Sequence, residues 1–345
     1  MAPNDVGGSQ DDCSKWEIRV EMRKMILTGV MAVALCGPAT GEDSMLLVLN
    51  KHEDTMSFVN PETYESIEKI ATGHNPHEIV ISRDRRYAYL SNYAPPGNTI
   101  SLIDLVNRKH VKQISTGDYG RIHGAAIAPD GKHAYFTAGQ SGYVVEVDTS
   151  SNEMSRAIPT HGKISHMVLV SPDGKRLYTA NIETENVSVI DIASGKLVTQ
   201  IPCESGCEGM AFTPDGAFLW AGNQTAGTIT IIDCARHEAI ETFPCPGMPV
   251  RIRFTPDGKR ALVSSWTENG ELVVIDVATR KEVTRLPVGS QAIGLELSPD
   301  GKRAFVGCEH RDGVHVVDLE SLTVTAKFET GNGSDSVAWW IPPEE

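Results

Sequence analysis

The sequence lacks the long apolar runs and clustered basic residues that mark membrane-spanning and nucleic-acid-binding proteins. Its longest apolar run is too short to cross a membrane as a helix, and helical periodicity is scarcely indicated anywhere. The formal net charge is −14, and no basic patch offers a contact for nucleic acid or an anionic membrane. Those partners are therefore disfavoured, whereas basic proteins, cations and small molecules stay open.

Catalytic and cofactor motifs are also missing. The sequence has no Gly-x-Ser-x-Gly elbow, no phosphate-binding glycine loop and no His-Glu-x-x-His segment. Neither Cys-x-x-Cys-His nor zinc-finger spacing occurs, which excludes covalently attached c-type haem and structural zinc. Function has to be sought in the way the chain repeats.

Most of the chain after residue 45 is a variation on one unit of four short strands. In the clearest copy, the tight turn 172–175 uses Pro to preset φ and Gly to adopt positive φ. Strands follow at 176–180, 187–191 and 197–201, and the apolar run 167–170 precedes the turn. Four antiparallel strands of this kind make one blade of a β-propeller.

The unit recurs at a steady period. The aspartate that ends the third strand stands at Asp104, Asp148, Asp191, Asp233, Asp276 and Asp318, in steps of 42 to 44 residues. A four-stranded repeat of that length indicates a propeller, because one such sheet cannot bury its faces alone.

The ends of the repeat region predict how the ring closes. Six complete units run over 77–329, and residues 45–71 supply three further strands without an innermost one. The missing strand is expected at 336–341, after the last complete unit. The sequence therefore predicts an all-β domain over 45–341: seven four-stranded blades, the first built from three N-terminal strands and one C-terminal strand, which removes an exposed sheet edge.

The strand endings resemble those of a known family. Leu-Tyr-Thr-Ala-Asn at 177–181, Ala-Tyr-Leu-Ser-Asn at 88–92 and Leu-Trp-Ala-Gly-Asn at 219–223 are similar to the repeats of YVTN-family bacterial β-propellers. The resemblance implies the fold but not one function, since similar propellers include lactonase-like enzymes, parts of periplasmic redox systems and surface proteins. Three blades depart from the Asn ending and carry Ala138, Ser265 and Cys308.

Residues 22–39 have the composition of a secretory signal, with a positive start, an apolar centre and a small-x-small site. We expect cleavage near Ala39 and a periplasmic or secreted protein. Residues 1–21 are then an over-extended or disordered start, with a functional arm as the alternative. A lipoprotein attached at Cys36 is another alternative, although Leu35 stands where a small residue is preferred.

Five cysteines follow the signal: Cys203, Cys207, Cys234, Cys245 and Cys308. The number is odd, so at least one is expected to be free. Cys203 and Cys207 share one inter-blade loop, and a disulfide between them is one open pairing in an oxidising compartment.

The repeats place chemically active residues in register. Seven residues before the turn aspartate, the blades carry His77, His123, His166, Glu208, Val250 and Ile293, and the closing strand offers Asp335. These positions begin the innermost strands, so the side chains are expected to converge at the mouth of the central channel. Three imidazoles with Glu208 suit zinc, copper, iron or manganese, with one position left open. In the alternative, each histidine packs between two blades. A shift of one residue in the strand register would move the side chain from the channel to this blade interface.

Other polar residues are expected around the same mouth. Arg121, Lys163 or Arg251 would hold an anionic group beside the metal, and Trp266 would stack on a ring. The remaining predicted rim residues are Asn181, Asn223, His310 and Asp335, the last of which would bind metal or loop amides.

Two functions of different classes stay open. In the first, the protein is a lactonase-like metal-dependent hydrolase, with Glu208 as fourth ligand or general base and Lys163 or Arg251 stabilising the developing anion. In the second, it is a non-catalytic ligand-binding or assembly module of a periplasmic redox or catabolic system, and its loop face holds a small ligand or a partner protein.

Overall fold

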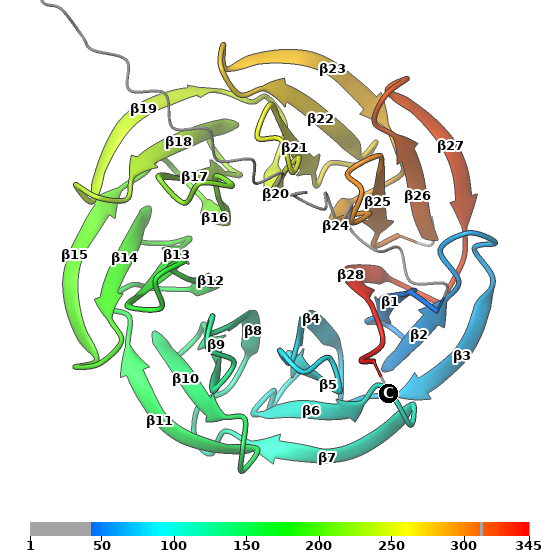
Figure 1. Ribbon diagram of the computed structural model, residues 1–345. Coiled ribbons are helices and arrows are strands. Elements are labelled where there is room, and N and C mark those ends of the chain that lie inside the picture. The colour runs from blue at the N-terminus through cyan, green and yellow to red at the C-terminus, as the bar shows by residue number, and fades with distance from the viewer. Residues whose placement is uncertain (1–42, 311–312, 345) are drawn as a thin grey trace, which may run out of the picture. The chain divides into compact units, whose positions relative to one another are not determined.

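The computed structural model describes residues 43–310 and 313–344, which lie in the compact unit Gly37–Glu345. The predicted signal segment and the residues before it lie outside this range. In the described residues the chain forms seven antiparallel sheets of four strands that follow one another round a ring (Figure 1). The predicted seven-bladed propeller is confirmed. None of these residues forms a helix long and apolar enough to span a membrane.

The strands take four places in their blades. The innermost are β28 (Ser334–Trp340), β4 (Pro76–Ile81), β8 (Ile122–Ile127), β12 (Ser165–Val170), β16 (Cys207–Phe212), β20 (Pro249–Phe254) and β24 (Ala292–Leu297). The second are β1 (Met45–Asn50), β5 (Tyr87–Asn92), β9 (His133–Ala138), β13 (Arg176–Asn181), β17 (Phe218–Asn223), β21 (Arg260–Ser265) and β25 (Arg303–Cys308). The third are β2 (Thr55–Val59), β6 (Thr99–Asp104), β10 (Tyr143–Asp148), β14 (Asn186–Asp191), β18 (Thr228–Asp233), β22 (Glu271–Asp276) and β26 (Gly313–Asp318). The outermost are β3 (Ser66–Ala71), β7 (Lys109–Ser115), β11 (Glu153–Pro159), β15 (Lys196–Pro202), β19 (Glu238–Pro244), β23 (Lys281–Pro287) and β27 (Thr323–Phe328).

The ring closes as the sequence predicts. Strand β28 pairs antiparallel with β1, with Met45 opposite Trp340 and Val48 opposite Val337. Figure 1 shows this red C-terminal strand beside the blue N-terminal one. The first blade is therefore completed from both ends of the repeat region, and its innermost strand has no unpaired edge toward β1.

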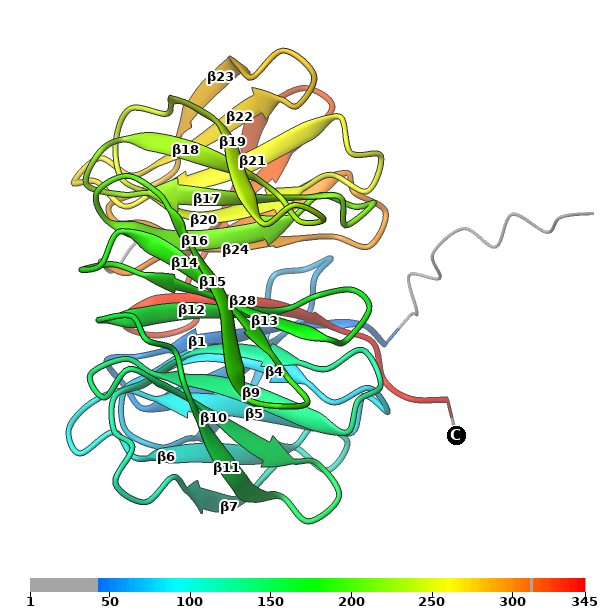
Figure 2. The same ribbon diagram turned by 90° about the vertical axis from the view of Figure 1, so that its left-hand side faces the viewer.

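The core lies between neighbouring blades. One apolar cluster joins Leu262 and Val274 of one blade to Leu295 and Val306 of the next. The middle strands are almost wholly buried, whereas the outermost strands, such as β15, which faces the viewer in Figure 2, alternate exposed and partly buried residues. Each blade therefore depends on its neighbours to cover its faces.

A buried polar contact fixes the loop that leads into an innermost strand. The hydroxyls of Thr160 and Ser165 lie 2.7 Å apart, and Ser165 donates to Asn181 Oδ1 at 2.7 Å. The first blade repeats the arrangement, with 3.2 Å between the Thr330 and Ser334 hydroxyls. Because Ser165 directly precedes His166, this contact anchors the chain just before it reaches the channel.

Ser165→Ala is expected to lower the free energy of unfolding by about 1 kcal/mol, because the buried Asn181 oxygen loses its shorter hydrogen bond and keeps only the one from Thr179 at 3.3 Å. Urea denaturation followed by circular dichroism measures the change. The control is Ser66→Ala on the exposed strand β3, with an expected change within about 0.5 kcal/mol. Equal stabilities for the two variants would contradict a structural role for the Ser165 contact.

Candidate functional site

The residues aligned in the sequence occupy one equivalent place in the structure. His77, His123, His166, Glu208, Val250, Ile293 and Asp335 are each the second residue of an innermost strand. In all seven blades the pairing register to the second strand shifts directly after the first residue of the innermost strand. A bulge re-aims the side chains next to it. Here the bulge lets the second and the third residue of each innermost strand face the channel.

The three histidines come together as the sequence predicts. The ring centroids of His77 and His123 are 4.9 Å apart, and those of His123 and His166 are 3.7 Å apart. Such close approach requires Gly124, since a Cβ there would lie 2.4 Å from the His166 carbonyl oxygen. The imidazoles of three adjacent blades form one contiguous group at the mouth.

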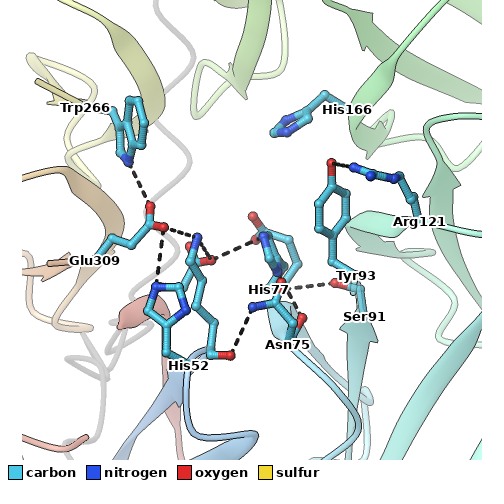
Figure 3. A network of polar contacts seen from close by, with 12 residues as sticks. His52, Asn75, His77, Ser91, Tyr93, Arg121, His166, Trp266 and Glu309 are labelled. Atoms are coloured by element: carbon cyan, nitrogen blue, oxygen red, sulfur yellow. Dashed lines mark hydrogen bonds and ion pairs between the residues drawn. The ribbon is translucent and has the colours of Figure 1, made fainter. Parts of the chain in front are cut away.

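An aromatic residue and a cation extend this group. The Tyr93 ring centroid lies 4.6 Å from that of His77 and 5.4 Å from that of His123. Arg121 donates to the Tyr93 hydroxyl at 3.0 Å, and its guanidinium carbon lies 5.2 Å from the ring centroid (Figure 3). A cavity of about 250 Å³ is lined by Tyr93, Arg121, His123, Gly139, Gln140, Ile164, Ser165 and His166.

The imidazoles are held in the neutral form. Burial lowers the pKa of His123 and of His166 well below the usual value, and it also lowers the pKa of His77. His123 is 3 % exposed, and its Nδ1 has no hydrogen-bond partner among the described residues. Nδ1 of His166 lies 3.6 Å from Glu208. His123 therefore offers a buried imidazole whose nitrogen the protein does not use.

A buried ion pair crosses the channel. Arg251, the third residue of β20, pairs with Glu78, the third residue of β4, and also lies 3.3 Å from Glu208. The strands β4 and β20 belong to blades on different sides of the ring (Figure 1). Burial raises the pKa of Glu208 to about 7, although Arg251 opposes the shift. Arg251 supplies the positive charge beside Glu208 where a metal ion was expected.

A second charged group completes the mouth. Lys51 Nζ lies 2.8 Å from Glu309 and 3.2 Å from Asp335, and Asp335 lies 3.8 Å from His77 Nε2. Trp266 donates to Glu309 at 2.9 Å (Figure 3). Burial opposes ionisation of Asp335, but Lys51 holds the pKa of this carboxyl below its usual value. Asp335 thus makes a salt bridge, a role that was not among those expected.

The other predicted site residues lie farther from this group. Lys163 and His310 are exposed on loops. Asn181 and Asn223 are fully buried inside their blades, because their side chains bond to residues of the neighbouring strand. They support the loops and do not form the rim.

Three residues of the site were not predicted from the sequence. Glu78 follows His77 directly, Tyr93 follows the asparagine that ends its strand, and Lys51 follows Asn50 in the same way. Two neighbouring positions in each repeat would have revealed them: the residue after the aligned histidine, and the residue after the strand-ending asparagine.

Comparison with known proteins adds a family similarity. Residues 170–302 match the family model described as the cytochrome D1 heme domain. Part of the chain resembles a haem domain. The match covers less than half of the chain and includes Glu208 and Arg251 but not the three histidines. No curated protein matches the chain.

Solved structures share the fold at low identity. Hydrazine synthase of Kuenenia stuttgartiensis is 23 % identical with a TM-score of 0.72, over 81 % of this chain and 93 % of that one. A functionally unknown protein from Desulfotomaculum acetoxidans DSM 771 is 16 % identical with a TM-score of 0.75, over 86 % and 99 %. Dihydro-heme d1 dehydrogenase NirN, in complex with DHE, is 18 % identical with a TM-score of 0.64, over 86 % and 74 %. At these identities the likeness shows the fold alone.

The expected divalent transition metal is wrong. The family model that matches residues 170–302 describes a haem domain and not a site for a divalent metal ion. The geometry also disfavours the expected metal ligands: the ring centroids of His123 and His166 are only 3.7 Å apart, and Glu208 is paired with Arg251. Within 43–310 and 313–344, no three His, Cys, Asp or Glu residues are placed to hold a metal ion.

Glu208→Gln is expected to remove a pH dependence of stability. Because folding raises the Glu208 pKa from 4.5 to about 7, the folded chain keeps a proton that the unfolded chain releases. As the pH rises from about 4.5 to about 7, the free energy of unfolding of the parent should therefore fall. The free energy of unfolding of the variant lacks this loss, so over the same pH range it should rise by up to about 3 kcal/mol relative to that of the parent. Urea denaturation at about pH 5 and about pH 8 measures the difference.

The matched control for this titration is Glu183→Gln, at an exposed position. Its difference in stability from the parent should change much less between the two pH values. If the Glu208→Gln difference were also constant, Glu208 would be ionised throughout, contrary to its burial between His166 and Arg251.

Proposed function

We propose that the protein is a non-catalytic ligand-binding module of a periplasmic redox system, and that the channel mouth binds a haem-type tetrapyrrole. The observation that carries the proposal is His123, a buried, neutral imidazole that lines the cavity and whose Nδ1 has no hydrogen-bond partner among the described residues. The similarity of residues 170–302 to a haem domain names the class of ligand. The signal segment in the sequence supports the periplasm as the compartment.

The residues at the mouth fit such a ligand. Neutral imidazole is a common axial ligand of haem iron, and His123 presents one. Arg121 has no carboxylate partner among the described residues, so it is available for a peripheral carboxylate of the macrocycle. The Tyr93 ring beside it offers an aromatic face. When bound, the tetrapyrrole iron would supply one-electron chemistry, and the chain would bind, orient and partly desolvate it.

The size of the cavity argues for an exposed ligand. At about 250 Å³ it is smaller than the ~300–1,000 Å³ of sites that enclose a drug-sized molecule. A tetrapyrrole held by Tyr93, Arg121 and His123 would keep part of its surface open to a partner. This suits a module that works with another protein better than an enzyme that encloses its substrate.

The hydrolase hypothesis loses its main support with the divalent metal. Arg251 is paired with both Glu208 and Glu78, so neither Glu208 nor Arg251 is poised as a general base or an anion-stabilising group. Lys163 is exposed on a loop. The strand endings that resemble the YVTN family are compatible with the proposed role, because that group includes parts of periplasmic redox systems.

Haemin titration tests the proposal. The purified parent should bind haemin saturably with a shift of the Soret band, and His123→Ala should weaken binding at least about tenfold because the iron loses its imidazole. Protoporphyrin without iron should bind both proteins alike, since Tyr93 and Arg121 remain.

The control is His110→Ala, on the outer strand β7, which should bind haemin like the parent. Circular dichroism confirms that each variant is folded. No saturable binding to the parent, or equal haemin affinity of the parent and His123→Ala, would overturn the assignment of the mouth as a tetrapyrrole site.

A further inference from the structure

Cys203 and Cys207 stand where two other blades have a pair of hydrogen-bonded hydroxyls. Cys207 is the first residue of β16 and lies opposite Asn223, as Ser165 begins β12 and lies opposite Asn181. Cys203 precedes it by four residues, the separation of Thr330 from Ser334.

The equivalent hydroxyls show that the fold brings these positions together. The oxygen atoms are 2.7 Å apart in the Thr160–Ser165 pair and 3.2 Å apart in the Thr330–Ser334 pair. The Cys203 thiol raises the pKa of the Cys207 thiol, so the two thiols are neighbours, and both cysteines are free in the structure. The Cys203 thiol donates to the Ile201 carbonyl oxygen at 3.8 Å. A disulfide needs Cβ atoms about 3.5–4.5 Å apart, a separation that suits neighbouring positions such as these.

Where a thiol stands in place of the hydroxyl, one buried amide oxygen has lost its hydrogen-bond donor. Asn181 Oδ1 accepts a hydrogen bond from Ser165 at 2.7 Å. The corresponding Asn223 Oδ1 is buried and has no partner among the described residues. The Cys207 thiol is instead a neighbour of the Cys203 thiol, which raises the pKa of Cys207. Oxidation of this pair would therefore leave the contacts of Asn223 unchanged.

We propose that Cys203 and Cys207 form a reversible dithiol–disulfide pair, a redox modification site directly before Glu208 at the channel mouth. Cys203 is half-buried and accessible, whereas Cys207 is fully buried. Gly206, at φ +81°, lets the short loop between them turn.

The Cys203–Cys207 disulfide would form by thiol–disulfide exchange with an external disulfide. The Cys203 thiolate attacks one sulfur of an external disulfide and releases one thiol, which takes up the proton that Cys203 lost. The Cys207 sulfur then attacks Cys203 in the mixed disulfide, loses its proton and releases the second thiol. One external disulfide is reduced to two thiols as the Cys203–Cys207 bond forms. Reduction by an external dithiol reverses both steps.

Oxidised glutathione is the probe. The folded protein is reduced with dithiothreitol, freed of reductant, incubated with oxidised glutathione, quenched in acid and alkylated in denaturant. Peptide mass spectrometry should then show that Cys203 and Cys207 alone escape alkylation and are linked. Dithiothreitol added to the folded protein should restore both thiols. Cys234, Cys245 and Cys308 should be alkylated throughout.

The matched control is Cys203→Thr with Cys207→Ser, which recreates the Thr330–Ser334 pair with its four-residue separation and should fold like the parent. It should lose no thiol to glutathione. Cys207→Ser alone should stop at a mixed disulfide between glutathione and Cys203. The proposal is overturned if Cys203 and Cys207 stay reduced in the parent, if a different pair forms, or if the disulfide resists dithiothreitol in the folded protein.

Discussion

The Arg251 guanidinium is the charge on which the channel mouth depends. It pairs with Glu78 from a blade on another side of the ring and with Glu208 from the neighbouring blade, and all three side chains are buried. Removing one partner of such a group costs about 3–5 kcal/mol because a buried charge is left uncompensated. With Glu208 held by Arg251, the neighbouring imidazoles are left without a strong acidic partner, and burial keeps them neutral.

Much of the fold could be predicted because the sequence repeats with a regular period. The period of Asp104, Asp148 and the later aspartates fixes the number of blades, and the unpaired strand at each end fixes the closure. The convergence of His77, His123 and His166 could also be predicted, since equivalent positions of a ring face one channel. The side chains that surround these imidazoles could not be predicted. A bulge turns the third residue of each innermost strand into the channel, and Arg251 and Glu78 reach it from blades far apart in sequence.

The same limit explains the incorrect metal site. Imidazoles and a carboxylate suit a metal ion by composition alone, but the ligand set also depends on which other cation reaches the carboxylate. Asn181 and Asn223 were placed on the rim for a similar reason. A strand-ending amide looks exposed in sequence, yet hydroxyls of the adjacent strand and loop bury it. A contact between distant blades decided the first case, and hydrogen bonds within a single blade decided the second.

The central claim is that the mouth carries a tetrapyrrole in the cell. The most direct measurement is the absorption spectrum and the native mass of the protein isolated from its own host, without added ligand. The account expects a Soret-region band and a mass that exceeds the mature chain by one tetrapyrrole, with both lost in His123→Ala. A mass equal to the chain alone, with no absorption beyond that of protein, would contradict it.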